Sequence, residues 1–237
     1  MTVDTVFDLA SLTKPLATGV AVMQCVERGP MQLDDLVVKH LPEFAPHGKD
    51  ELTVRDLLIH QSGLIADNAL GDYEQGPEEA WRRICNLKLQ SPRGTKFVYS
   101  DVNFIVLGKL VERLEGKSLA EVVRERISRP LGLTETGYLP DESLRQRAAL
   151  TQQRDGRWLR GEVHDPRAAK LGGVAGHAGL FSTADDLAVY AQTLLAGGTW
   201  NERRVLNSDT LATMTRSYKV SSGERGLSWD KLSLIHI

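Results

Sequence analysis

The sequence has few cysteines, no excess of either charge and no long apolar run. Its two cysteines, Cys25 and Cys85, each fall within an apolar helical pattern. Two cysteines do not make a disulfide framework, so we expect two buried free thiols. No run approaches the roughly 20 apolar residues of a membrane-spanning helix, so we expect no transmembrane segment. Neither a disulfide-stabilised scaffold nor a helical membrane protein is predicted.

The charge balance argues against further kinds of partner. The chain has 29 Lys and Arg against 31 Asp and Glu, a net charge of −2, and the two signs are interspersed. No basic patch indicates nucleic acid or a membrane surface as a partner. With 237 residues, 41% of them hydrophobic, the chain is long enough for one large domain or two closely joined ones.

What the chain does have is a serine and a lysine at the start of a predicted helix. In Ser11-x-x-Lys14, Ser11 is placed to cap a helix over 12–28, and the first turn brings Lys14 to the side of Ser11. An amine three residues from a hydroxyl can activate a serine nucleophile. The pattern is short, and an ordinary capped helix with a solvated lysine also explains it.

The remaining pattern predicts a mainly helical chain with few strands. Three spacings are those of capping boxes, Thr53-x-x-Asp56, Ser118-x-x-Glu121 and Ser182-x-x-Asp185. The helix that begins after Ser118 should end before Pro130. Further helices are expected at about 77–87, 102–114 and 206–216, and extended pieces at about 4–9, 96–99, 148–151 and 158–161.

Two other polar segments are candidates for a site. The triplet Tyr-Ser-Asp at 99–101 lies where an extended piece turns into a helix, and His177 lies in a glycine-dense loop over 172–179. Tyr99 follows Ser11 by 88 positions, so only tertiary folding can bring the two together. A half-buried aromatic with its hydroxyl at the surface is the alternative for Tyr99.

Several motifs then occur together in a fixed order. They are VFDLASLTKP (6–15), LTVRDLLIHQSGL (52–64), SPRGTKFVYSDVNFIVLGKLVERLEGKSL (91–119), RPLGLTETGY (129–138) and GGVAGHAGLFSTADDLAVY (172–190). With them the chain resembles the serine β-lactamase-like hydrolases of the class C group. That group includes class C β-lactamases, D-alanyl-D-alanine carboxypeptidases, D-aminopeptidases and β-lactamase-fold carboxylesterases. The resemblance implies an α+β, β-lactamase/transpeptidase-like fold, with a helical domain and an antiparallel sheet flanked by helices.

The resemblance also implies roles for three residues. Ser11 would be the acylated nucleophile, and its backbone N–H would supply half of the oxyanion hole. Lys14 would hydrogen-bond Ser11 and help to accept its proton. Tyr99 would be the general base, because a neighbouring cation such as Lys14 favours the ionised phenol.

The second motif departs from the family at one position. Asp101 stands where β-lactamases and penicillin-binding proteins usually have Asn, and Asn103 follows two residues later. The usual Asn hydrogen-bonds the acylamino side chain of a β-lactam or peptide, whereas an ionised Asp accepts hydrogen bonds without donating any. Asp101 and Asn103 are both candidate substrate-binding residues, and the departure favours ester or peptide substrates over β-lactams.

None of the histidines is predicted to be catalytic. His177 precedes the Ser-Thr-Ala helix, so the family's last motif cannot be assigned to it. It is either a substrate-binding residue at the rim of the cleft or a structural loop histidine. His60 and Ser62 resemble a family corner that supports the site, and we expect both to be structural. His164-Asp165 has no metal-ligand companions at a useful spacing, so no metal and no cofactor are predicted.

The ends of the chain do not match the family. The resemblance implies strands before residue 6 and after residue 230, and most of the central sheet consists of them. Residues 1–230 are therefore expected to be a partial β-lactamase-like domain that is poorly stable or inactive by itself, and 231–237 a probable non-native tail. The chain shows no signal peptide. If one was lost, the location is periplasmic or extracytoplasmic, and otherwise cytoplasmic.

The predicted function is that of a serine hydrolase acting through an acyl-enzyme on an ester or amide. The substrate would be a small ester, amide or β-lactam, or a peptidoglycan-derived peptide, and carboxylesterase or D-amino-acid peptidase activity is favoured over true β-lactamase activity. The alternatives are a non-catalytic penicillin-recognising or cell-wall-sensing domain, and an inactive fragment.

Overall fold

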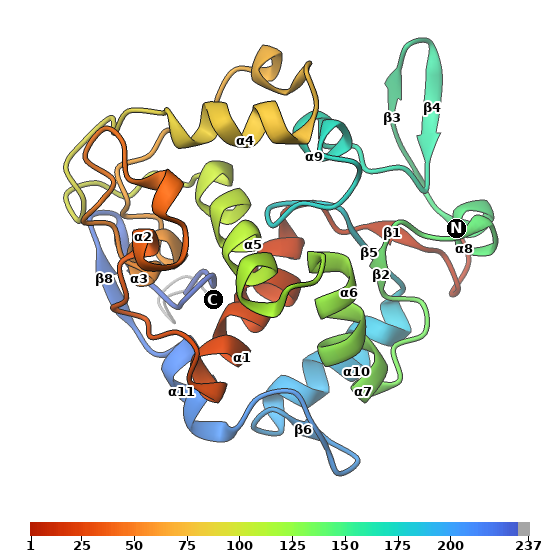
Figure 1. Ribbon diagram of the computed structural model, residues 1–237. Helices are drawn as coiled ribbons and strands as arrows, with labels where there is room; N and C mark the ends of the chain where they lie inside the picture. The colour runs from red at the N-terminus through yellow and green to blue at the C-terminus, as the bar shows by residue number, and fades with distance from the viewer. Residues whose placement is uncertain (232–237) are drawn as a thin grey trace.

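Figure 1 shows a computed structural model of the chain, in which residues 1–231 are described. The expected tail, except for its first residue, lies outside the described residues. Eleven α-helices occur in the described part: α1 (Val20–Arg28), α2 (Val37–His40), α3 (Val54–Leu58), α4 (Pro77–Cys85), α5 (Asp101–Glu115), α6 (Leu119–Val123), α7 (Arg129–Leu131), α8 (Glu142–Arg147), α9 (Pro166–Lys170), α10 (Ala184–Leu195) and α11 (Ser208–Thr215).

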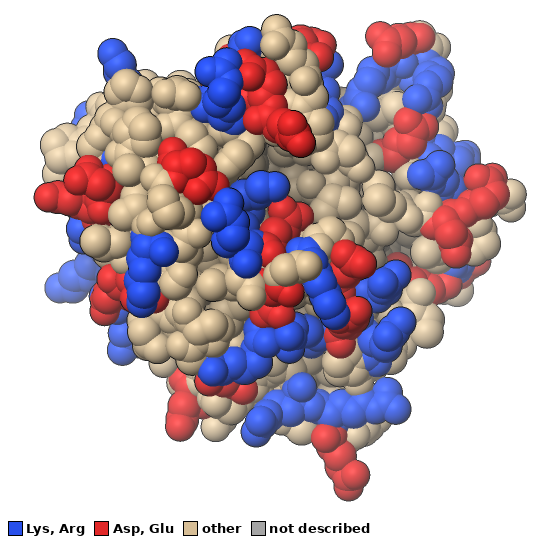
Figure 2. Space-filling view, viewed as in Figure 1, with Lys and Arg blue, Asp and Glu red and all other residues tan. Residues whose placement is uncertain are grey.

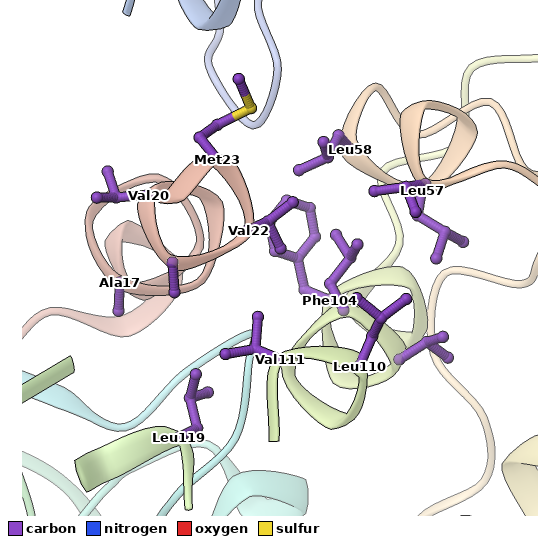
Figure 3. Close-up of a cluster of buried hydrophobic side chains, with 14 of the residues drawn as sticks. Ala17, Val20, Val22, Met23, Leu57, Leu58, Phe104, Leu110, Val111 and Leu119 are labelled. Atoms are coloured by element: carbon purple, nitrogen blue, oxygen red, sulfur yellow. The ribbon is translucent and has the colours of Figure 1, made fainter. Parts of the chain in front are cut away.

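The core forms around α1 and α5. Both helices are apolar on most sides, and α5 contacts α1, α2, α3 and α6. Figure 3 shows their side chains meeting, with Val22 of α1 near Phe104 of α5 and Leu58 of α3. The Ser100 hydroxyl caps α5 by accepting from the Asn103 N–H, and Gly116 ends it with a φ of 64°. The central helix is thus delimited by local sequence signals.

A small sheet lies beside these helices, where the segment that carries Ser11 begins. Its strand order is β1 (Phe7–Asp8), β5 (Leu180–Ser182) and β2 (Gly137–Tyr138), all antiparallel. Three two-stranded ribbons complete the strands of the described part: β3 (Leu150–Arg154) with β4 (Arg157–Arg160), β6 (Thr199–Trp200) with β7 (Arg203–Arg204), and β8 (Tyr218–Val220) with β9 (Gly223–Arg225). The ribbon β3–β4 projects from the body (Figure 1). The expected α+β fold with few strands is confirmed.

Several local predictions are confirmed. Thr53 and Ser118 each form a complete capping box with the acidic residue three positions later. Both cysteines are free and buried. Acidic and basic side chains are mixed over the face shown in Figure 2, in agreement with the small net charge. Across residues 1–231, none of the helices combines the length and apolar character needed to cross a bilayer.

Three local predictions are wrong. Ser11 does not cap a helix but lies in a 3₁₀ turn, Ala10–Leu12, followed by a π-helical stretch, Lys14–Gly19, that leads into α1. Ser182 ends strand β5, so α10 begins one residue later and Thr183 is its cap, accepting from the Asp186 N–H.

The helix after Ser118 also does not end before Pro130. A π-helical stretch, Arg124–Ser128, shifts the hydrogen-bond register, and Pro130 then occupies the first turn of α7. Proline has no N–H to donate, and a local π-helical shift of the hydrogen-bond register is one way in which a helix accommodates that missing bond. The chain therefore continues in helical form until Gly132.

Candidate active site

The serine of the Ser-x-x-Lys motif sits on a constrained turn at the end of β1. Ser11 is exposed, and Ala10 before it has a φ of 48°, which a non-glycine residue rarely adopts. The Asp8 carboxylate accepts from the Ala10 N–H at 2.9 Å and fixes this bend. Pairing of Asp8 with Phe181 anchors the start of the turn to β5. The serine hydroxyl is thereby presented to solvent from a defined backbone.

Lys14 is buried beneath that serine. Its side chain is 2% exposed, and its Nζ lies 2.9 Å from Ser11 Oγ, 2.7 Å from Asp101 Oδ1 and 3.3 Å from the His177 carbonyl oxygen. An ammonium has three N–H donors, and three oxygen atoms surround this one. A buried charge requires such pairing. The alternative of a solvated lysine is therefore excluded for Lys14.

Tyr99 completes the predicted catalytic group, though not through its hydroxyl. The Lys14 Nζ lies 4.8 Å from the centroid of the Tyr99 ring, a cation–π distance, and the ring is 43% exposed. Within residues 1–231, no hydrogen bond joins the Tyr99 hydroxyl to Ser11 or Lys14. The fold nevertheless brings together three side chains that span 88 positions of sequence.

His60 supports the segment that carries Tyr99. Its Nδ1 accepts from the Ser100 N–H at 2.9 Å, and its ring packs against Tyr99 at 4.6 Å between centroids. Burial, together with the charges of Arg225 and Lys14, holds the pKa of His60 well below its ordinary value. The imidazole therefore stays neutral and keeps the acceptor that Ser100 needs. This is the structural role expected for His60.

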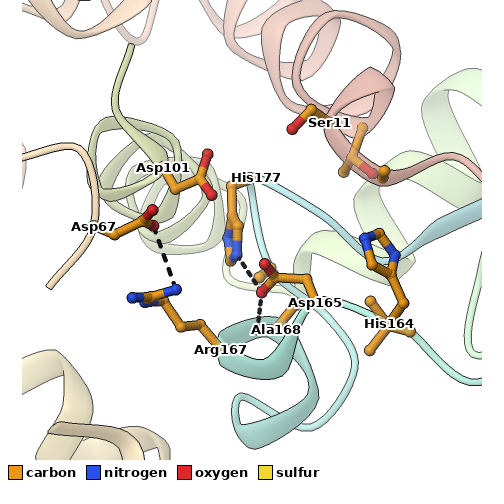
Figure 4. Close-up of polar contacts among 12 residues, drawn as sticks. Ser11, Asp67, Asp101, His164, Asp165, Arg167, Ala168 and His177 are labelled. Atoms are coloured by element: carbon orange, nitrogen blue, oxygen red, sulfur yellow. Dashed lines mark hydrogen bonds and ion pairs between the residues drawn. The ribbon is translucent and has the colours of Figure 1, made fainter. Parts of the chain in front are cut away.

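A polar network extends from Lys14 on the other side (Figure 4). Asp101 faces Lys14, and the His177 ring donates or accepts at 2.9 Å with Asp165, which also caps α9 by accepting from the Ala168 N–H at 2.7 Å. Burial alone would raise the pKa of Asp165, but the His177 hydrogen bond and charge outweigh it and lower the pKa to about 2. Asp165 is therefore an anion, and the His177 Nε2 carries the shared proton.

The structure corrects two predicted substrate contacts. Asn103 is fully buried and accepts from the Ser62 hydroxyl at 2.6 Å, since it lies about 200° around α5 from Asp101. The His177 ring is 1% exposed, and what this residue offers Lys14 is its backbone carbonyl. Neither side chain reaches the surface of the site, and the burial of His177 favours the interpretation as a structural loop histidine. Asp101 alone of the three faces the reactive pair.

Three residues of this network have the geometry of a metal-binding group. Ligand atoms of Asp101, Asp165 and His177 all lie within 4.8 Å of one another. Their wide separation in sequence hides this grouping from any spacing rule, so Asp165 does have companions that its sequence neighbourhood does not reveal. Asp101 is already paired with the Lys14 ammonium and Asp165 with His177, so a further cation would be repelled by Lys14. The absence of a metal stays a prediction.

Sequence reasoning missed two other residues of this region. Asp8 is fully buried in its side chain and holds the bend before Ser11, and His164 binds it at 3.0 Å. His164 and Asp165 are neighbours in sequence, yet His164 contacts Asp8 and Asp165 contacts His177. The His-Asp dipeptide was the only local signal, because its partners are long-range.

A helical body, a small antiparallel sheet and a serine–lysine pair define the β-lactamase/transpeptidase-like class, and comparison with known proteins narrows it. The family model described as Beta-lactamase matches residues 1–231. The chain therefore belongs to the β-lactamase family. It is 36% identical over 257 residues to a protein of Escherichia coli K12 named "putative D-alanyl-D-alanine carboxypeptidase", with 96% of this chain and 59% of that protein covered. A Salmonella agona protein of the same name is 34% identical over the same shares.

Solved structures agree on the fold. A penicillin-binding protein homologue from Caulobacter crescentus superposes with a TM-score of 0.76 at 23% identity, covering 95% of this chain and 67% of that one. The octameric penicillin-binding protein homologue from Pyrococcus abyssi gives 0.75 at 25% identity, covering 96% and 53%. The chain thus spans 59% of the length of the curated relatives that it matches.

Proposed function

We propose that this chain carries the nucleophile of a serine hydrolase that works through an acyl-enzyme. The observation that supports the proposal most directly is the position of the Lys14 Nζ, 2.9 Å from Ser11 Oγ and held by Asp101 at 2.7 Å. A buried cation against an exposed serine hydroxyl stabilises the alkoxide that forms during attack.

In the proposed reaction, Ser11 Oγ attacks the carbonyl carbon of an ester or amide. Lys14 lies within reach of three oxygens and pairs with Asp101, so it can place positive charge beside the serine oxygen. Tyr99 acts as the general base that takes the serine proton, and the Ser11 N–H donates to the developing oxyanion. Tyr99 then gives the proton to the leaving group. In the second half, Tyr99 takes a proton from a water that attacks the acyl carbon and gives it to Ser11 Oγ, which releases the acid.

The preferred substrate is a D-amino-acid peptide or an ester. The names of the curated relatives support a peptide, and Asp101 supports a substrate that presents an N–H to this side of the site. A β-lactam, whose acylamino carbonyl meets a donor in the usual Asn enzymes, fits Asp101 less well.

A non-catalytic penicillin-recognising domain is the second candidate. It is favoured by one observation: within the described residues, the Tyr99 hydroxyl has no hydrogen bond to Ser11 or Lys14. Such a protein would acylate slowly and keep its acyl group.

The test is covalent labelling with a fluorophosphonate and with a fluorescent penicillin, followed by peptide mass analysis. It is run on this chain and on a chain lengthened at both ends to the size of its relatives. We expect label on Ser11, none on Ser11→Ala, and labelling slowed roughly 10²–10⁴-fold by Tyr99→Phe. Label that persists in Ser11→Ala would remove Ser11 as the nucleophile. Label that forms but is never released from an ester substrate would favour the second candidate.

A further inference from the structure

Two adjacent residues outside the Ser-x-x-Lys motif, His164 and Asp165, each begin a chain of hydrogen bonds. One chain ends at Ala10, immediately before Ser11, and the other ends at Lys14. They lie on the segment leading into α9, and Figure 4 shows them pointing in different directions. Among the hydrogen bonds of residues 1–231, none joins either residue directly to Ser11 or Lys14. Each acts through one intermediate residue, Asp8 or His177.

The first chain runs from His164 to the bend before Ser11. The backbone N–H of His164 donates to Asp8 Oδ2 at 2.8 Å, and the ring Nδ1 of His164 lies 3.0 Å from the same oxygen. The other Asp8 oxygen accepts from the Ala10 N–H. Since Ala10 has a φ of 48°, its conformation is strained and persists only where the surroundings hold it. The Asp8 carboxylate, held by His164, is such a support.

The second chain runs from Asp165 to Lys14. Asp165 Oδ1 is fixed by the Ala168 N–H and accepts from the His177 Nε2–H at 2.9 Å. Within residues 1–231 the other ring nitrogen, Nδ1, is buried without a partner, so Asp165 is the polar anchor of this ring. The carbonyl of the same histidine accepts from the Lys14 Nζ at 3.3 Å. One residue thus contacts Asp165 through its ring and Lys14 through its carbonyl.

We propose that His164 and Asp165 are positioning residues, which together hold the Ser11 bend and the Lys14 ammonium in the geometry that acylation requires. The inference rests on the proposed function, in which Ser11 is the nucleophile. Because the two residues are adjacent, one segment sets the relative placement of hydroxyl and ammonium. A displacement of about 1 Å between reacting groups can lower a rate about 100-fold.

The experiment measures fluorophosphonate labelling of Ser11 in the chain length that labels, and separates the maximal labelling rate from the half-saturating concentration. Asp165→Ala removes the acceptor, whereas Asp165→Asn keeps an oxygen for both Ala168 and His177. Asp141→Ala is the matched control, because Asp141 caps α8 in the same way, through the Leu144 N–H, with no hydrogen bond to the residues of the site.

We expect Asp165→Ala to lower the maximal rate about 10–100-fold with the half-saturating concentration unchanged, and Asp165→Asn to restore most of the rate. Asp141→Ala should label like the parent after a similar loss of melting temperature. A parent-like rate in Asp165→Ala would overturn the proposal, as would an equal loss in Asp165→Asn, which would replace positioning with a charge effect.

A second variant keeps the proposal testable if Asp165→Ala does not fold. The His164 side chain is 36% exposed, so His164→Ala is a mild change, and it leaves the backbone N–H on Asp8. We expect a fall of about 10-fold in the maximal rate and recovery in His164→Asn, whose amide can donate to Asp8 in place of Nδ1. An unchanged rate in His164→Ala would overturn the positioning role of His164. Label that survives in Ser11→Ala would instead show that the proposed function itself is wrong.

Discussion

The helices α1 and α5 are linked by charge at both ends, and the two links differ in what they leave available. At one end, Lys14, just before α1, pairs with Asp101, the first residue of α5. At the other, Arg28, the last residue of α1, pairs with Glu115, the last residue of α5, which also binds Arg126 at 2.6 Å. The same pair of helices thus has an ionic contact at each end.

In the far link, the Glu115 carboxylate is fully paired with arginine side chains. Both Glu115 oxygens are taken by guanidinium groups, Arg28 and Arg126, whose side chains are 37% and 38% exposed. Burial would raise the pKa of Glu115, but hydrogen bonds from these two arginines lower it. The near link is buried more deeply, and its lysine keeps one contact for the exposed Ser11 hydroxyl. A structural ion pair satisfies its charges internally, whereas the near pair directs part of its charge at a reactive group.

Removal of the Lys14 ammonium is the change that should separate the two ion pairs most clearly. Lys14→Met should lower the rate of Ser11 labelling roughly 10²–10⁴-fold, because the alkoxide loses its neighbouring charge. Labelling rate and far-ultraviolet circular dichroism are the measurements. Lys109→Met is the control, since Lys109 makes only an exposed pair with Glu112 on α5. Rapid labelling of a folded Lys14→Met would show that both ion pairs are merely structural.

The matching change at the far end should affect stability and leave reactivity alone. Glu115→Gln leaves Arg28 and Arg126 without their anion, and we expect a loss of about 1–2 kcal/mol, kept small because both guanidiniums reach solvent. Urea unfolding measures it, and Ser11 labelling should match the parent once corrected for the folded fraction. A slowed label at full folding would mean that the two ends are coupled through the helices.

The smallest expected effect concerns pH and the support of Tyr99. The pKa of His60 is depressed in the folded state by burial and by Arg225 and Lys14. As the pH falls below the ordinary histidine pKa of about 6.5, His60 is protonated in the unfolded chain but stays neutral in the folded chain. Stability is therefore full above that pH and is lost below it, by at most about 1.4 kcal/mol per pH unit.

His60→Asn tests this directly. Asparagine tolerates the positive φ of 59° at this position and can accept from the Ser100 N–H, but it does not titrate. The difference in unfolding free energy between parent and variant should narrow as the pH falls from 7 towards 5. The subtraction removes the other titrating groups, including His164, whose pKa is raised by its hydrogen bond to Asp8 and which acts in the opposite sense. A constant difference would show that His60 protonates freely.

How much the sequence predicts depends on how local the signal is. The capping boxes of Thr53 and Ser118 were predictable, because the cap and its acidic partner are three residues apart. At Ser182-Thr183 two candidate caps stand side by side, and strand pairing with β1 decides between them. The π-helical stretch before Pro130, after which the helix continues as α7, depends on packing that no local rule describes.

In the candidate site, too, the local contacts could be predicted from the sequence and the long-range contacts could not. Ser11 and Lys14 are visible as a motif, and Tyr99 only through resemblance to a family. The pairing of Lys14 with Asp101 and of Asp165 with His177 has no sequence signature, because ion pairs across distant segments leave no periodicity or spacing. Asn103 shows the converse error: two residues of one motif need not share a face, since a helix turns by about 100° per residue.

The glycine loop has a consequence for the order in which this protein becomes competent. The loop contacts the segment that follows Ser11 through hydrogen bonds from Lys14 to the His177 carbonyl and from Thr18 to the Gly176 carbonyl. Leu180, the first residue after the loop, donates its N–H to Thr13. These contacts join residues more than 150 positions apart, so closing them is entropically costly and slow. The serine is synthesised more than 150 residues before the loop that holds its lysine in place, so it must wait for that loop. A growing or clipped polypeptide is thereby expected to carry a latent, unreactive serine.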